Sequence, residues 1–190
     1  MSDTTMYAYD LEFLEDGRTI ELISIGIVSE TGREYYAVNA DMPVDEIRHE
    51  RWLMENVVPS LPTRPKTMVV AIGTGRPFEL DRTNAAVKPK WVIANEVREF
   101  LLAEGKPDLW ADYGAYDHVA LCQLWGRMID LPEGIPMYTN DLQQALKLTP
   151  TFKPVEQTEG QHNALEDARH LMRVLLEWDM FDDEGDELRE

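Results

Sequence analysis

The sequence contains a single cysteine, Cys122, so no disulfide can form within the chain. Cys122 lies in a run of helical character at residues 120–124, where we interpret it as a small packed side chain rather than a nucleophile. The chain also lacks an apolar run of membrane-spanning length, and its first residues lack the pattern of a signal peptide. We therefore expect a soluble, cytoplasmic protein that does not associate with membranes.

Positive charge is scarce as well. The chain has 18 lysines and arginines against 36 aspartates and glutamates, a net charge of -18. Residues 179–190 hold seven acids and one arginine, a net of -6 that leaves -12 for the remainder. We interpret residues 181–190 as a solvated acidic tail. A broad basic surface for nucleic acid is excluded, so such a substrate would be held through metal ions and a few arginines.

The remaining 180 residues are enough for one domain with a real core, and 44% of the chain is hydrophobic. We find neither an internal repeat nor a low-complexity linker. Short apolar strands come first, joined by the tight-turn pairs Asp16-Gly17 and Thr31-Gly32, which predicts an antiparallel meander. Strands and helices then alternate, which predicts one mixed α/β domain. Expected strands are residues 6–13, 19–29, 34–38, 68–72 and 108–111; expected helices are 44–57, 89–104, 115–125, 141–146 and 164–178; expected loops are 73–88 and 149–161.

Two acids, Asp10 and Glu12, interrupt the first apolar strand one residue apart. Alternate residues of a strand share a face, so both carboxylates point the same way and repel each other. No lysine or arginine is near in the sequence, which makes a divalent metal ion the natural partner. For an isolated Asp-x-Glu pair, a water-facing edge strand is the commoner explanation, and the case for metal depends on further residues.

The last expected helix offers a third acid. At about 100° per residue, Asp167 falls on the flank of the apolar stripe and can face the sheet. Asn163 has the position of an N-cap, with Glu166 three residues later. His162 then precedes the helix in non-helical backbone, from which its ring can turn toward Asp167. We expect His170 on the opposite, solvated side.

Asp117 heads an apolar stripe in the expected helix 115–125. One interpretation is an acid that the helix dipole favours in a first turn, and the other is a further carboxylate facing a metal. Asp112 competes for this role, but it follows a strand and no helical face directs it. His118 lies about 100° from Asp117 and is expected to be a surface or packing residue.

In combination, these residues resemble the DEDDh class of 3′-to-5′ exonucleases. That class has Asp-x-Glu on the first strand, an aspartate at a helix start in mid-chain, and His-x4-Asp at a late helix. Longer segments are similar to the bacterial polyadenylate-specific exoribonucleases, and the similarity covers most of the chain. It departs at about residues 63–88, which look like an inserted loop region, and in the acidic tail. The segments that carry it are residues 9–22, 32–38, 114–126 and 162–169.

The resemblance implies a ribonuclease-H-like fold: a mixed sheet with three antiparallel strands first and flanking helices, forming one exonuclease domain over residues 1–180. It implies hydrolysis of single-stranded RNA from the 3′ end, with A-rich ends preferred, to nucleoside 5′-monophosphates. Members of the family are often homodimers. The implied cofactor is two Mg²⁺ ions, for which Mn²⁺ can substitute.

The resemblance also assigns roles to the motif residues. It implies that Asp10 bridges both ions, that Glu12 and Asp167 hold the ion that activates water, and that Asp117 serves the other ion. His162 is implied as the general base. Phe13 and Leu14 are expected to wedge or stack against the terminal bases, with core packing as an equal alternative. The expected substrate contacts are Leu11, Phe13, Leu14, Arg18 and Arg169.

Three alternatives stay open at this point. An endonuclease of the same fold uses four carboxylates and lacks the loop histidine, so His162 argues against it. A non-catalytic module that binds RNA or protein is disfavoured by the presence of every ligand position. An oligoribonuclease for very short substrates, or a DNA exonuclease of the same fold, is not separated from the poly(A) enzyme by the sequence.

Overall fold

The computed structural model describes residues 4–64 and 78–187, with side chains described as far as Trp178. The expected strand at residues 68–72 and the first part of the expected loop at 73–88 lie outside the described residues. The described ends of this region are anchored in the core, because Phe78 and Leu80 are buried and Thr63 pairs with Leu80 in an antiparallel bridge.

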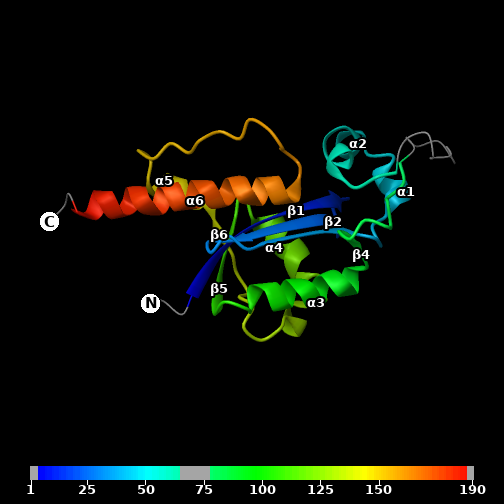
Figure 1. Ribbon diagram of the computed structural model, residues 1–190, viewed down its shortest axis with the longest axis horizontal. Helices are drawn as coiled ribbons and strands as arrows, with labels where there is room; N and C mark the ends of the chain where they lie inside the picture. Colours follow the sequence, from blue (N-terminus) through cyan, green and yellow to red (C-terminus); the bar gives the residue numbers. More distant parts are fainter. Residues whose placement is uncertain (1–3, 65–77, 188–190) are drawn as a thin grey trace.

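Six strands form one mixed sheet in the order β4-β3-β2-β1-β5-β6 (Figure 1). The pairs β1–β2 and β2–β3 are antiparallel, whereas β3–β4, β1–β5 and β5–β6 are parallel. The three antiparallel strands come first, as the sequence predicts. The strands are β1 (Thr4–Glu15), β2 (Ile20–Ser29), β3 (Glu34–Asn39), β4 (Val87–Lys88), β5 (Lys106–Ala111) and β6 (Asn140–Asp141).

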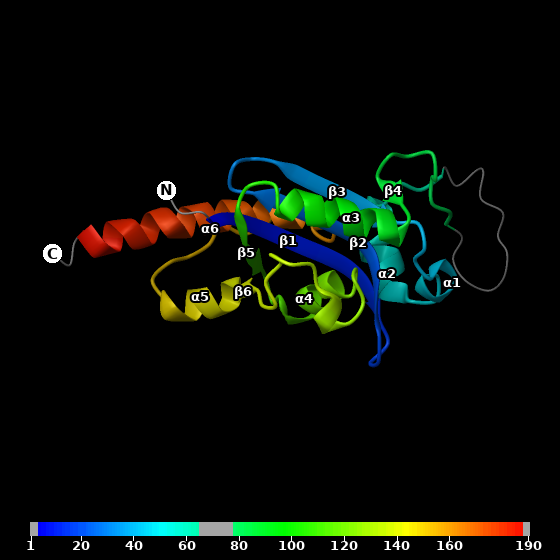
Figure 2. The ribbon, with the colours of Figure 1, turned by 90° about the horizontal axis from the view of Figure 1, so that it is seen from below.

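Turn chemistry explains why the first strands fold back on one another. The Asp16 carboxylate accepts hydrogen bonds from the backbone N–H of Arg18 and Thr19, at 2.8 and 2.7 Å. Gly17 and Gly32 both have positive φ, which glycine adopts without strain. The hairpin between β1 and β2 projects past the helices in Figure 2. Strand β5 pairs with β1 only from Thr4 to Ala8, so no strand pairs with the later part of β1 on that side.

Helices cover both faces of the sheet. In Figure 1, α6 lies along one face, while α3 and α4 lie on the other. Buried side chains of β1 and β2 alternate between these layers: Tyr9 and Ile27 pack toward α3 and α4, whereas Ala8 and Val28 pack toward α6. The helices are α1 (Val44–Ile47), α2 (Arg51–Asn56), α3 (Lys90–Leu101), α4 (Ala115–Cys122), α5 (Leu142–Leu148) and α6 (Ala164–Glu187), with 3₁₀ turns at η1 (Val58–Ser60) and η3 (Met128–Asp130).

Several element boundaries differ from the expected ones. Helix α4 ends at Cys122 instead of near residue 125, and α3 ends at Leu101, before Gly105. Helix α6 continues to Glu187, so most of the acidic segment at 181–190 extends this helix, and no proline interrupts it. Strand β6 was not expected, since two residues are too short to show a period.

None of the helices that the structure describes is long and apolar enough to cross a membrane. A mixed sheet that begins with three antiparallel strands, continues with parallel strands and carries helices on both faces is the ribonuclease-H-like arrangement. The predicted fold class is therefore confirmed.

Candidate active site

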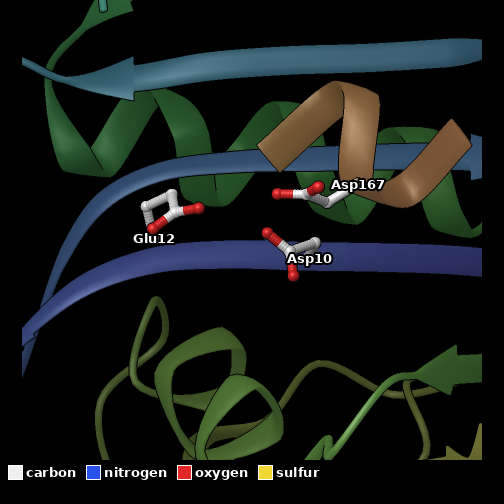
Figure 3. A group of neighbouring side chains, drawn as sticks. All are labelled: Asp10, Glu12 and Asp167. Carbon is white, nitrogen blue, oxygen red and sulfur yellow. The ribbon is translucent and has the colours of Figure 1, made fainter. Parts of the chain in front are cut away.

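Three carboxylates meet where β1 faces the start of α6. Asp10, Glu12 and Asp167 each offer an oxygen, and these oxygens all lie within 4.8 Å of one another (Figure 3). Asp10 and Glu12 lie on the same face of β1, before a bulge that shifts the register between Glu12 and Phe13. Asp167 comes from the first turns of α6, one turn after the fully buried Ala164. The predicted shared face and the predicted approach of Asp167 are both confirmed.

The cluster is electrostatically uncompensated. Desolvation, then repulsion by Asp117, Glu12 and Asp167, raises the pKa of Asp10 well above its usual range. Desolvation and repulsion by Asp167 and Asp117 raise the pKa of Glu12 to about 8. Among the described residues, no lysine or arginine lines the cavity around these acids, which has a volume of about 590 Å³. A group of hard oxygen donors with this excess of negative charge fits Mg²⁺ or Mn²⁺.

Asp117 reaches the same cavity from α4 and is 8% exposed. Strand β5 pairs with β1 only as far as Ala8, so the following backbone of β1 has a free edge. Asp117 uses this edge: its carboxylate accepts a hydrogen bond from the backbone N–H of Leu11 at 3.0 Å. It is not part of the group within 4.8 Å. Burial raises its pKa to about 6, although the backbone hydrogen bonds oppose the shift.

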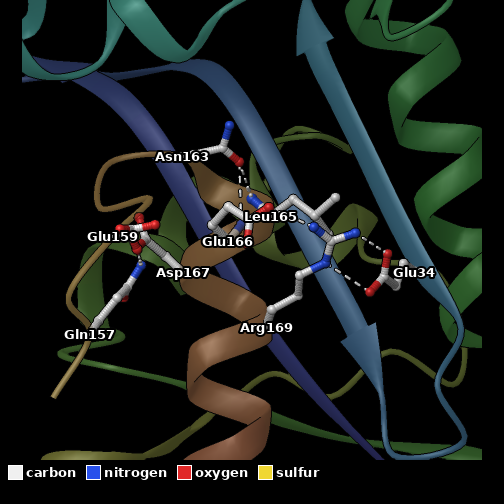
Figure 4. A network of polar contacts seen from close by, with 8 residues as sticks. All are labelled: Glu34, Gln157, Glu159, Asn163, Leu165, Glu166, Asp167 and Arg169. Carbon is white, nitrogen blue, oxygen red and sulfur yellow. Dashed lines mark hydrogen bonds and ion pairs between the residues drawn. The ribbon is translucent and has the colours of Figure 1, made fainter.

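His162 lines the cavity. Its backbone is left-handed (φ 62°), in agreement with the expected non-helical residue before the N-cap Asn163. Its carbonyl accepts a hydrogen bond from the Ser60 hydroxyl at 3.0 Å, and its ring lies edge-on to Trp52 with centroids 4.8 Å apart. Asn163 caps α6, because its side-chain oxygen accepts hydrogen bonds from the N–H of Leu165 and Glu166 at 3.1 and 3.2 Å (Figure 4). Trp52 of α2 thus contacts the ring of His162, and Ser60 of η1 holds its backbone.

Gln157 is a site residue that sequence reasoning missed. Its side-chain amide donates a 2.7 Å hydrogen bond to the Asp167 carboxylate (Figure 4). It belongs to the segment between α5 and α6, whose residues 154–157 form one wall of the cavity. A loop residue without periodicity gives no sequence signal for such a contact. The hydrogen bond orients the Asp167 carboxylate toward the other acids.

One expectation about a neighbouring residue is wrong. His170 is half-buried and lines the cavity, instead of facing solvent on the opposite side. Three residues along a helix turn through about 300°, which places His170 only about 60° from Asp167. Asp112, the expected competitor of Asp117, also lines the cavity, but it is exposed and accepts a hydrogen bond from Gln143 at 2.8 Å. His118, by contrast, packs as expected, with Nδ1 3.3 Å from the hydroxyl of Tyr9.

The expected substrate contacts separate into two groups. Leu11 and Phe13 line the cavity, and the Phe13 ring is stacked on Tyr116 with centroids 6.4 Å apart. Leu14 does not line it. It is 7% exposed and belongs to the core cluster that includes Ile23 and Leu53, where α2 covers this end of the strand. The alternative of core packing therefore holds for Leu14.

Neither expected arginine lines the cavity. Arg169 lies about 200° from Asp167 around α6 and pairs with Glu34 and Glu166, with Nε 2.8 Å from Glu34 Oε1 and NH1 2.6 Å from Glu166 Oε1 (Figure 4). Arg18 is exposed in the turn between β1 and β2. The expectation that Arg169 contacts a phosphate in this cavity is wrong, because its guanidinium is directed away and bound to two carboxylates.

Comparison with known proteins agrees with this geometry. No protein-family model matches the sequence. Two curated relatives, from the CDC 1551 / Oshkosh and ATCC 25618 / H37Rv strains of Mycobacterium tuberculosis, are both named 3′-5′ exoribonuclease. Each is 40% identical to the chain over 169 residues, which cover 88% of this chain and 89% of the relative. The chain therefore belongs to the 3′-5′ exoribonuclease family.

Proposed function

We propose that the protein is a metal-dependent 3′-5′ exoribonuclease of the DEDDh class, which shortens single-stranded RNA to nucleoside 5′-monophosphates. The observation that carries the proposal is the meeting of Asp10, Glu12 and Asp167 within 4.8 Å in one cavity. Membership of the family supports the reaction and its direction. The fold and the histidine at the cavity rim support the class.

The carboxylates of Asp10, Glu12 and Asp167 would hold Mg²⁺ or Mn²⁺, and Asp117 serves the same cavity from the side of α4. When bound, a pair of such ions lowers the pKa of an attacking water and neutralises charge on the leaving oxygen. Asp117 has a further task, because its hydrogen bond to the N–H of Leu11 fixes the strand that carries two of the acids.

The protein's own groups perform the remaining steps. A ring nitrogen of His162 accepts the proton of the attacking water, and Trp52 keeps that ring at the rim of the cavity. The water oxygen bonds to the terminal phosphorus while the bond from phosphorus to the preceding O3′ breaks. The O3′ takes a proton, so the products are a 5′-monophosphate and an RNA shortened by one nucleotide. Leu11 and Phe13 offer apolar surface to the terminal base.

The resemblance to polyadenylate-specific enzymes supports a preference for A-rich 3′ ends and a homodimeric, cytoplasmic protein. These are the parts of the proposal that depend on similarity alone. The acid cluster and His162 act on the phosphodiester, so they do not by themselves distinguish one base at the 3′ end from another.

A time course with 5′-labelled substrates tests the proposal. Oligoadenylate, oligouridylate, DNA and a dinucleotide are incubated with and without Mg²⁺, beside a circular RNA and an RNA with a blocked 3′ end. We expect a ladder that shortens from the 3′ end, no reaction in excess EDTA, and no reaction on circular or blocked RNA. Full activity in EDTA contradicts the metal site, and cutting of circular RNA indicates an endonuclease.

A further inference from the structure

Gly26 occupies the position in β2 that pairs with Asp10 in β1. Paired residues of neighbouring strands direct their side chains to the same face, so a side chain at Gly26 would lie beside the Asp10 carboxylate. The space there is already filled. A Cβ atom at residue 26 would lie 2.2 Å from the carbonyl oxygen of Ala164, 2.3 Å from its carbonyl carbon and 2.4 Å from the nitrogen of Leu165.

These neighbours are backbone atoms of the first turn of α6, so no rotation of a side chain can relieve the contact. Cβ atoms essentially never approach another heavy atom closer than 3.0 Å, and the shortest of these distances falls 0.8 Å below that. Helix α6 therefore rests directly on the backbone of β2, closer than any residue other than glycine permits.

The contact lies within one turn of the acid cluster. Ala164 is fully buried, Asp167 follows it by three residues, and His162 precedes it by two. Gly26 and Asp10 are partners across the strands, so the point at which α6 touches the sheet is also the point at which Asp167 faces Asp10. A displacement of α6 at Gly26 moves Asp167 and His162 away from β1 together.

We infer that Gly26 is a positioning residue for the acid cluster. Because glycine allows the start of α6 to lie directly against β2, it sets the spacing between Asp167 and the pair Asp10–Glu12. This spacing in turn sets the affinity of the cluster for metal. The inference rests on the proposed function. A displacement of about 1 Å can cost roughly 10²-fold in rate, and outer-shell changes typically cost about 10–100-fold in metal affinity. A single methyl group at residue 26 is enough to cause a displacement of that size.

The test compares Gly26→Ala with Val28→Ala. Val28 lies two residues further along β2, buried against the same helix, and its truncation weakens packing without pushing α6 outward. The first readout is the Mn²⁺ concentration that gives half of the metal-induced rise in melting temperature. The second is kcat on oligoadenylate at saturating Mn²⁺. Circular dichroism checks the fold of each variant.

We expect Gly26→Ala to raise the Mn²⁺ midpoint at least 10-fold and to lower kcat, while Val28→Ala lowers the melting temperature and keeps the wild-type midpoint. Adding Asp167→Glu to Gly26→Ala lengthens the displaced acid by one methylene group and should recover part of the affinity. A wild-type midpoint in folded Gly26→Ala, or an equal rise in both single variants, overturns the inference.

If Gly26→Ala does not fold, Ala168→Val carries the test. Ala168 is fully buried on the same helix, one residue after Asp167, and its added methyl groups lift α6 without contact to Gly26. A raised Mn²⁺ midpoint supports control by helix spacing, and an unchanged one overturns it. Failure of the proposed function has a different signature, because the wild-type protein itself would then show neither Mn²⁺ stabilisation nor activity on RNA.

Discussion

Glu12→Gln should stabilise the metal-free protein. Glu12 is 8% exposed, and its pKa rises from 4.5 to about 8 in the folded state. A carboxyl group with a raised folded pKa binds its proton more tightly when folded, so it removes stability as pH rises from 4.5 toward 8. At pH 7 this amounts to 2.5 pH units at 1.36 kcal/mol each, a cost of roughly 3 kcal/mol. Glutamine keeps the shape of the side chain and removes the charge.

In EDTA at pH 7 we therefore expect Glu12→Gln to raise the free energy of unfolding above that of the wild type by up to roughly 3 kcal/mol. This corresponds to about 6–12 °C in melting temperature. The advantage should shrink as pH falls through 4.5, because the wild-type carboxyl group then becomes protonated in the unfolded state as well. Excess Mg²⁺ should reverse the order, because ligand binding stabilises the wild-type protein and the variant has lost a ligand charge. The change of sign with metal is specific to an acid cluster that holds a cation.

The assay is thermal and urea unfolding from pH 5 to 9, in EDTA and in Mg²⁺. Glu15→Gln is the matched control, since Glu15 ends the same strand and is exposed. We expect the control to stay within about 0.5 kcal/mol of the wild type under both conditions. A Glu12→Gln variant that is less stable than the wild type at pH 8 in EDTA would refute the argument from burial and repulsion of this carboxylate.

Three further predictions concern α6 and the residue before it. His162→Ala should keep the fold and metal binding but lose ~10²–10⁴-fold in kcat, measured on oligoadenylate at saturating Mg²⁺, whereas His170→Ala should lose less than about tenfold because it is not required as the base. Asp167→Asn should lose metal affinity as well as rate by Mn²⁺ titration, while Glu166→Gln, its exposed neighbour, should change neither. Arg169→Ala should cost at most about 1 kcal/mol in unfolding experiments and leave KM for RNA unchanged, because its ion pairs are partly exposed and face away from the cavity.

Periodicity made much of the site predictable. Alternation along β1 is enough to place Asp10 and Glu12 on one face, and the 100° step of a helix is enough to turn Asp167 toward them. The same step places His170 only about 60° from Asp167, although His170 lies opposite the apolar stripe of the helix. The angle to Asp167, and not the angle to the core, therefore decides that His170 lines the cavity.

Contacts made by irregular backbone, or between segments far apart in the sequence, could not be predicted from periodicity. Gln157 reaches Asp167 from a loop whose path no period describes. Leu14 packs into the core with Leu53, and the sequence alone does not show that α2 covers this end of β1. The pairing of Arg169 with Glu34 joins residues 135 positions apart, which requires knowledge of how α6 crosses the sheet. The requirement for glycine at residue 26 likewise arises from the backbone of α6 that lies against it, which the sequence alone does not show.

The distribution of charge bears on how an acidic protein can handle RNA. Nucleic-acid binding along a chain depends on cations that meet successive phosphates. Here the net charge is -18, and the cavity wall that the structure describes carries neither lysine nor arginine. Many arginines are engaged by the protein's own acids: Arg33 with Glu104, Arg48 with Asp45, Arg51 with Glu55, Arg64 with Glu79, Arg127 with Asp130, and Arg169 with Glu34. Under the proposed metal binding, attraction would be concentrated at the acid cluster, and the enzyme would bind the last nucleotides of a strand instead of binding along its length.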